Sequence, residues 1–102
     1  MLKAAKSKNG ESIRLSDARW THIVEHHDDL PGYRDQVLSV IEEPDVIVRG
    51  KSGELLALKA RGDLTLVAVY REISRTDGFI ITAFLTSQPE RIRKRGVAWQ
   101  KR

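Results

Sequence analysis

The spacing of hydrophobic positions predicts a helix at the start of the domain. Ser16 is a candidate N-cap. After it, the i, i+3, i+4, i+7 spacing of one helical face is formed by Trp20, Ile23, Val24 and His27. A Pro-Gly pair at residues 31–32 then interrupts the pattern. We therefore expect this helix to end before residue 31.

A second helix and a series of strands follow. The apolar residues Val37, Leu38 and Ile41 predict a helix from about residue 33 to 43. Beyond residue 45 the pattern is strand-like, over residues 46–49, 54–60, 64–74 and 79–87. The turns between these strands are short, which favours an antiparallel meander. The predicted fold is α+β, with two N-terminal helices packed on a mainly antiparallel sheet of four strands, or five if residues 14–16 add one.

The length and composition indicate one domain, residues 1–102. We expect about residues 1–12 to be a flexible N-terminal segment and about residues 89–102 to be a basic tail. The chain has no cysteine, which excludes disulfides, thiolate metal sites and a cysteine nucleophile. It also has neither an apolar run of about 20 residues nor an apolar signal core. We therefore expect a cytoplasmic protein with no membrane association, whereas the oligomeric state cannot be predicted.

Charge is unevenly distributed along the chain. Residues 17–45 contain eight acidic and two basic residues, whereas residues 46–102 contain twelve basic and five acidic ones. A basic surface beside an acidic one suggests a polyanionic partner, because lysine and arginine displace counterions from phosphates. A tail that only improves solubility would show the same composition. Both interpretations stay open at this point.

All three histidines lie in the first predicted helix. At 100° per residue, His27 falls in the apolar stripe, whereas His22 and His26 lie with Arg19 on a different side. Histidine can accept and donate protons near neutral pH, so His27 is a candidate for acid-base chemistry. A hydrogen-bonded core position for His27 and solvent exposure for His26 are the plain structural alternatives.

A metal site is a further alternative for this helix. His22 and His26 are four residues apart, a spacing that can chelate a divalent ion. The segment does not have the His-Glu-x-x-His pattern, however, and no third ligand is marked. We therefore expect no metal and no other cofactor.

The predicted sheet offers partners for a histidine. Period-two alternation places Thr82, Phe84 and Thr86 on one face, and Ile81, Ala83 and Leu85 on the other. In the preceding strand, either Tyr70 or Arg71 could lie beside the two threonines, depending on register. Lys59 ends another strand with a cationic group. Each of these residue types is also common on the exposed face of a sheet.

The order and spacing of several short motifs resemble those of a known nuclease group. The motifs are Arg19-Trp20-Thr21-His22-Ile23, His27, Tyr33-Arg34-Asp35-Gln36-Val37, Glu43-Pro44-Asp45 and Gly78-Phe79-Ile80-Ile81-Thr82-Ala83-Phe84. They resemble phage and bacterial RNase-like domains of the Barnase, EndoU, colicin and RelE-like superfamily, from about residue 16 to 86. The resemblance implies a helix-plus-sheet fold with a cleft that cuts RNA without metal. For a toxin-like nuclease of this kind it also implies a neutralising protein partner.

The resemblance assigns roles to individual residues. His27, His22 and Thr82 match catalytic positions, and Arg19 matches a substrate-binding position. In such cleavage a base removes the proton of a ribose 2′-hydroxyl and an acid protonates the departing 5′-oxygen. Charge on the phosphate needs preorganised donors, for which the candidates are Arg19, Lys59, Tyr70, Arg71 and Thr86. The helical angle of about 140° between His22 and His27 is unfavourable for a direct pair, so a strand residue is the alternative second proton-transfer group.

Two other classes of function fit the same pattern. A non-catalytic nucleic-acid-binding module would bind RNA or DNA through the basic tail and Trp99 without turnover. A protein-interaction domain would instead use the acidic helical half to bind a basic partner.

Overall fold

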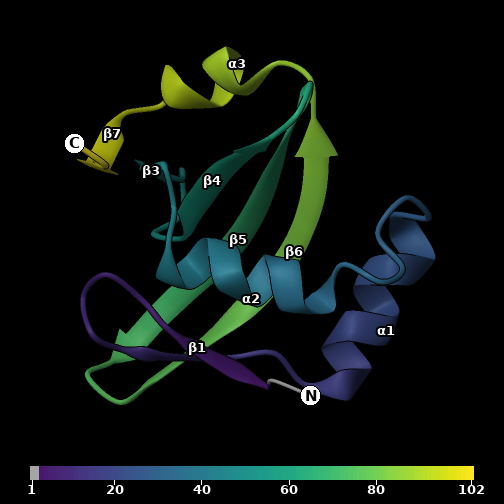
Figure 1. The fold of residues 1–102 in the computed structure, drawn as a ribbon. Coiled ribbons are helices and arrows are strands. Elements are labelled where there is room, and N and C mark those ends of the chain that lie inside the picture. The colour runs from purple at the N-terminus through teal and green to yellow at the C-terminus, as the bar shows by residue number, and fades with distance from the viewer. Residues whose placement is uncertain (1–2) are drawn as a thin grey trace.

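The computed structural model describes residues 3–102 and shows an α+β fold built on one seven-stranded mixed sheet (Figure 1). Residues 1–2, part of the predicted flexible segment, lie outside the described residues. The elements in chain order are β1 (Ala4–Lys6), β2 (Ser12–Arg14), α1 (Asp17–His26), α2 (Arg34–Glu42), β3 (Val46–Arg49), β4 (Leu55–Arg61), β5 (Leu64–Ser74), β6 (Asp77–Thr86), α3 (Pro89–Arg93) and β7 (Val97–Gln100). None of the helices described is long and apolar enough to cross a membrane.

The predicted sheet of four or five strands was wrong, because three further strands extend the meander. The strand order is β1-β2-β6-β5-β4-β3-β7. β2 pairs with β6 in parallel at Ile13↔Gly78 and Arg14↔Phe79, which makes the sheet mixed. β1 extends the β2 edge, and β7 pairs with β3 within the predicted basic tail. The tail also forms a third helix, α3, so the helices are not confined to the N-terminal half.

The two long helices form because each has an apolar side that the sheet covers. Ser16 caps α1 by accepting a hydrogen bond from the Arg19 backbone N–H at 3.1 Å. Ile23 is the residue that α1 buries, and Trp20 and Val24 are half-buried beside it. α2 buries more of its surface, at Val37, Leu38, Val40 and Ile41.

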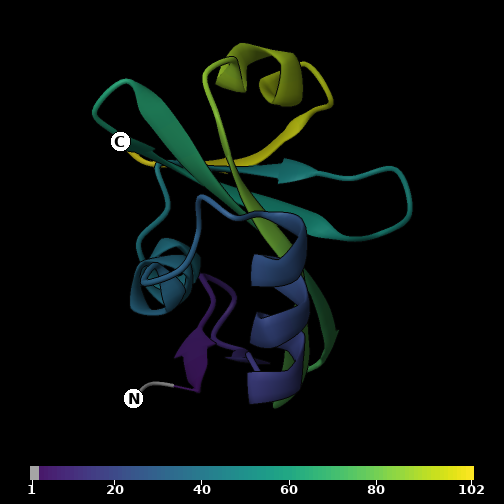
Figure 2. The same cartoon turned by 90° about the vertical axis from the view of Figure 1, so that its right-hand side faces the viewer.

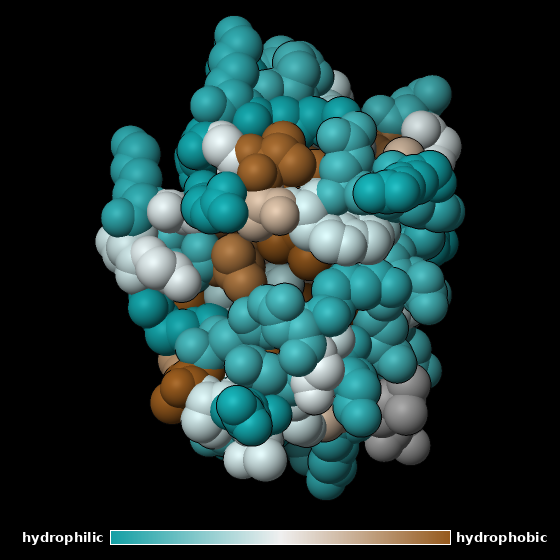
Figure 3. Space-filling view, turned by 90° about the vertical axis from the view of Figure 1, so that its left-hand side faces the viewer, coloured by the Kyte–Doolittle hydropathy of each residue, from teal (hydrophilic) through white to brown (hydrophobic). Residues whose placement is uncertain are grey.

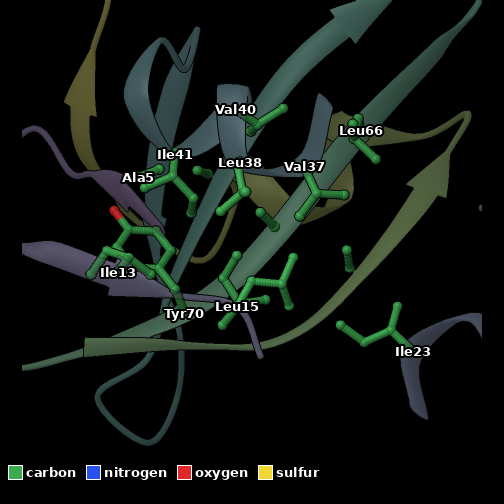
Figure 4. Packing of buried hydrophobic residues seen from close by; sticks show 14 of the residues in the cluster. Ala5, Ile13, Leu15, Ile23, Val37, Leu38, Val40, Ile41, Leu66 and Tyr70 are labelled. Atoms are coloured by element: carbon green, nitrogen blue, oxygen red, sulfur yellow. The ribbon is translucent and has the colours of Figure 1, made fainter. Parts of the chain in front are cut away.

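The sheet separates two hydrophobic clusters. The larger cluster lies between the sheet and the helices α1 and α2, and Figure 4 shows Leu38 and Ile41 of α2 within it, together with Ile13 and Tyr70 of the sheet. The smaller cluster lies on the opposite face, where Ile92 of α3 contacts residues from β3, β4 and β5. Figure 2 shows α2 and α3 on opposite sides of the sheet and α1 along β6. We call the face covered by α3 the α3 face.

A bulge in β6 corrects the predicted alternation of side chains. Val69 pairs with Thr82 and Tyr70 with Ile80, so Ile81 has no partner across the β5–β6 ladder. Ile81 consequently packs with Phe84 on the α3 face, rather than with Ala83 on the other face.

Candidate functional site

A pocket of about 320 Å³ opens on the α3 face of the sheet. Its apolar floor comes from one residue of each central strand, and its charged rim comes from the β3–β4 loop and the segment after α3. The lining residues are Lys51, Glu54, Leu56, Val69, Phe84 and Arg95. The pocket therefore combines an aromatic ring with charged groups in a concave site, as ligand-binding pockets do.

Two cations line this pocket and a third lies near its β3–β4 loop. Lys51 and Arg95 line it, and the guanidinium Nη1 of Arg71 lies 3.1 Å from the position that a Cβ on Gly53 would occupy, in the same β3–β4 loop. Over residues 3–102, the cations that form ion pairs are other ones, namely Lys3, Lys8, Arg14, Arg34 and Lys59. The positive charge of the pocket is thus available to an anionic ligand.

One carboxylate, that of Glu54, lies among these cations. Its Oε1 accepts a hydrogen bond from the backbone N–H of Ser52 at 2.9 Å, which holds the side chain against its own loop. The described lining of the pocket therefore carries one acid beside two cations, with Arg71 as a third cation nearby.

His27 does not line the pocket itself but lies against Phe84, which does. The two rings are 6.4 Å apart between centroids and inclined by 30°. α1 runs alongside β6. Near the start of the helix, Nη1 of Arg19 donates to the Ile81 carbonyl at 3.4 Å. His27 follows the last residue of α1, and its carbonyl accepts from the Leu30 N–H at 3.0 Å. Since Leu30 is fully buried, this turn fixes the backbone of a half-buried histidine.

The structure brings several predicted site residues to the α3 face. Thr82 pairs with Val69, which lines the pocket, and it precedes Phe84 by two residues on the same strand. Thr86 continues this face and accepts a hydrogen bond from the Gln88 N–H at 3.1 Å, at the start of the segment leading to α3. Arg71 of β5 places its Nη1 near Gly53, in the loop that supplies Lys51 and Glu54 to the pocket.

Tyr70 and Lys59 lie away from the pocket. Tyr70 is buried in the larger cluster on the opposite face of the sheet, where burial, with the charges of Glu72 and Glu11, raises the pKa of its hydroxyl. Lys59 donates from Nζ to the Glu43 carbonyl at 2.9 Å and thereby ties β4 to the end of α2. The register that the sequence left open is therefore settled, with Arg71 and not Tyr70 beside the pocket.

His22 is also separated from the pocket. It is exposed and forms a ring pair with His26, with centroids 4.5 Å apart. A different hollow, lined by Ser16, Ala18, Arg19 and His22, adjoins it. The structure thus does not place His22 beside His27 as a second proton-transfer group.

Sequence reasoning missed Lys51, Glu54 and Arg95 as site residues. The turn Lys51-Ser52-Gly53 and the basic segment at 91–95 were both visible in the sequence. What the sequence did not indicate is that α3 folds back over the sheet through Ile92, which is 7% exposed, and so carries Arg95 to the β3–β4 loop.

Comparisons with protein-family models, curated proteins and solved structures found no match for this chain. Among residues 3–102, no group of three or more histidine, aspartate or glutamate side chains is arranged to hold a metal ion. The chemistry of the pocket therefore has to be argued from its own residues. Cations can hold a phosphate, the Phe84 ring offers a surface for a base, and His27 can transfer a proton.

Proposed function

We propose that the protein is a metal-independent endoribonuclease of the Barnase, EndoU, colicin and RelE-like type, and that the pocket beside Phe84 is its active site. The observation that carries the proposal is that His27, the half-buried residue after α1, lies against Phe84, which lines a pocket with the cations Lys51 and Arg95. Arg71 lies near the β3–β4 loop of this pocket, and among residues 3–102 none of these three cations forms an ion pair. A phosphate held by the cations would lie beside a group able to transfer protons. The proposed RNA substrate explains the aromatic floor, because an unpaired base can stack on the Phe84 ring.

The proposed reaction is transfer of the phosphodiester to the neighbouring ribose hydroxyl. A base removes the proton from O2′, O2′ bonds to phosphorus, the P–O5′ bond breaks, and an acid gives a proton to O5′. His27 takes one of these proton transfers. Glu54 is the carboxylate that lines the same pocket and is the candidate for the other. Lys51, Arg71 and Arg95 stabilise the charge that gathers on the phosphate oxygens.

A non-catalytic nucleic-acid-binding module is the second candidate function. It is favoured by one observation. His22 pairs with His26 on α1, whereas the ring of His27 lies against Phe84, so His22 is not placed to be the second proton-transfer group beside His27. The same cations and aromatic floor would then bind RNA without turnover. In either case we propose a cytoplasmic protein whose partner is RNA. If it acts as a toxin-like nuclease, a neutralising protein would cover this basic pocket.

The deciding experiment is cleavage of total cellular RNA and tRNA in excess EDTA by the wild type, His27→Ala and His26→Ala. His26, the last residue of α1, is the exposed neighbour of His27 and is the matched control. We expect the wild type and His26→Ala to cleave equally and His27→Ala to be slower by about 100-fold or more, the usual contribution of a general acid or base. Equal cleavage by His27→Ala contradicts the proposed role. Binding of RNA without cleavage by the wild type supports the binding module instead.

A further inference from the structure

The exposed side of α1 carries a histidine pair that the proposed nuclease does not use. His22 and His26 are one helical turn apart and both are exposed. Their rings lie 4.5 Å apart between centroids and are tilted by 44°. Side chains that meet in this way on one helix face can act on the same ligand.

The ring separation fits two imidazoles on one metal ion. Zinc lies about 2.0–2.1 Å from an imidazole nitrogen, so each ring centre is about 3 Å from the ion and two rings at a tetrahedral angle are about 5 Å apart. The observed separation of 4.5 Å is close to this value.

The orientation of His26 also suits a metal ligand. Its Nδ1 lies 2.9 Å from the backbone carbonyl of His22. A carbonyl can only accept, so Nδ1 carries the proton and Nε2 keeps its lone pair. A ring nitrogen that donates to a carbonyl while the other nitrogen binds the ion is the usual arrangement of metal-binding histidines.

The surroundings of the histidine pair leave space for a hydrated ion. Between residues 17 and 29 the chain has four acidic side chains and one basic side chain, Arg19. Beside His22 an open hollow of about 310 Å³ leaves room for water molecules on the remaining coordination positions. The lining of this hollow includes Arg19, and Asp17 is paired with Lys3 and Arg34, so the hollow supplies space for a hydrated ion rather than negative charge.

We propose that His22 and His26 form a surface site for a late first-row divalent ion, with Zn²⁺ as the leading candidate. Imidazole suits zinc, copper and nickel and binds magnesium and calcium poorly. The protein supplies two ligands and water supplies the rest, so the ion is exchangeable. This site is distinct from the pocket beside Phe84, and it is independent of the proposed nuclease activity.

The test is calorimetric titration of Zn²⁺ into the metal-free full chain at pH 7.5. His22→Ala and His26→Ala each remove one ligand, and His27→Ala is the matched control from the same segment. We expect one ion per chain, an affinity lower by about 10-fold or more in each ligand variant, and an unchanged affinity in the control. Affinity should also fall at pH 5, because protons compete for the ring nitrogens. An unchanged affinity in His22→Ala, or no binding by the wild type, overturns the proposal.

Imidazole nitrogen NMR gives a second readout that does not depend on affinity. Addition of Zn²⁺ should shift the Nε2 resonance of His26 most strongly, because Nδ1 retains its proton toward the His22 carbonyl. Nδ1 ligation of His26, or equal shifts at His27, would contradict the proposed geometry. Both histidines are exposed, so their substitution should leave the fold intact, which circular dichroism checks.

Discussion

Replacing Arg71 by glutamine is expected to remove about one phosphate contact from RNA binding and to weaken its salt dependence accordingly. Arg71 is one of three cations at the pocket beside Phe84 and forms no ion pair among residues 3–102. For single-stranded nucleic acid, the slope of log affinity against log salt is about −0.7 per neutralised phosphate. Contacts by all three cations therefore give a slope of about −2.1, and loss of one gives about −1.4.

These slopes correspond to a difference that is easy to measure. Raising the salt from about 50 to 200 mM should weaken binding about 18-fold in the wild type and about 7-fold in Arg71→Gln. Cations of α3 that also contact RNA would make both slopes steeper, but the difference of about 0.7 between them would stay.

The assay is fluorescence anisotropy of a 2′-O-methyl RNA oligomer, which cannot be cleaved, at several salt concentrations. Lys59→Gln is the matched control, because Lys59 is bound to the Glu43 carbonyl on another part of the molecule. An equal slope for the wild type and Arg71→Gln would refute the assignment of phosphate binding to this pocket. An altered slope for Lys59→Gln would move the RNA surface elsewhere.

Two further predictions concern stability. Arg34→Met should lower the free energy of unfolding in urea by about 1–3 kcal/mol, because it leaves the Leu15 carbonyl without the donor that Arg34 supplies at 2.8 Å. An unchanged midpoint would show that this contact is not stabilising. Glu11→Gln should stabilise the protein at pH 7 but not at pH 4. Desolvation and the charge of Glu72 raise the pKa of Glu11. The ionised carboxylate therefore disfavours folding once the pH has risen through that pKa, and glutamine removes this charge. Urea midpoints that differ equally at both pH values would contradict the second prediction.

The central part of the fold could be predicted from hydrophobic spacing. α1, α2 and strands β3 to β6 lie within a few residues of the predicted ranges, because each has a clear period of 3.6 or 2. β1 and β2 have three residues each, which is too short for a periodic signal. β2 is stabilised by parallel pairing with a strand more than sixty residues away, and local sequence carries no information about such a partner.

The candidate site could be predicted only in part. The helical period predicted that His27 and His22 lie on different sides of one helix. The structure keeps His22 paired with His26 and His27 against Phe84, but α1 ends at His26, so the prediction that His27 is a helical residue was wrong. The choice between Tyr70 and Arg71 depended on register, which the bulge at Ile81 affects and which a simple alternation does not reveal. Lys51 and Arg95 line the same pocket because α3 packs back on the sheet. This packing is a tertiary contact that local sequence does not reveal.

The position of β7 at the end of the sheet has a consequence for biosynthesis. β3 has the sequence Val-Ile-Val-Arg and pairs on its outer side with β7 alone among the described residues. Because β7 comes last in chain order, the outer edge of β3 stays open while residues 50–96 are being synthesised. An open, apolar, β-branched strand is a template for pairing with another chain. Newly made molecules should therefore be most prone to self-association just before residues 97–100 are synthesised. A chain truncated before β7 would keep the outer edge of β3 open and should stay prone to self-association.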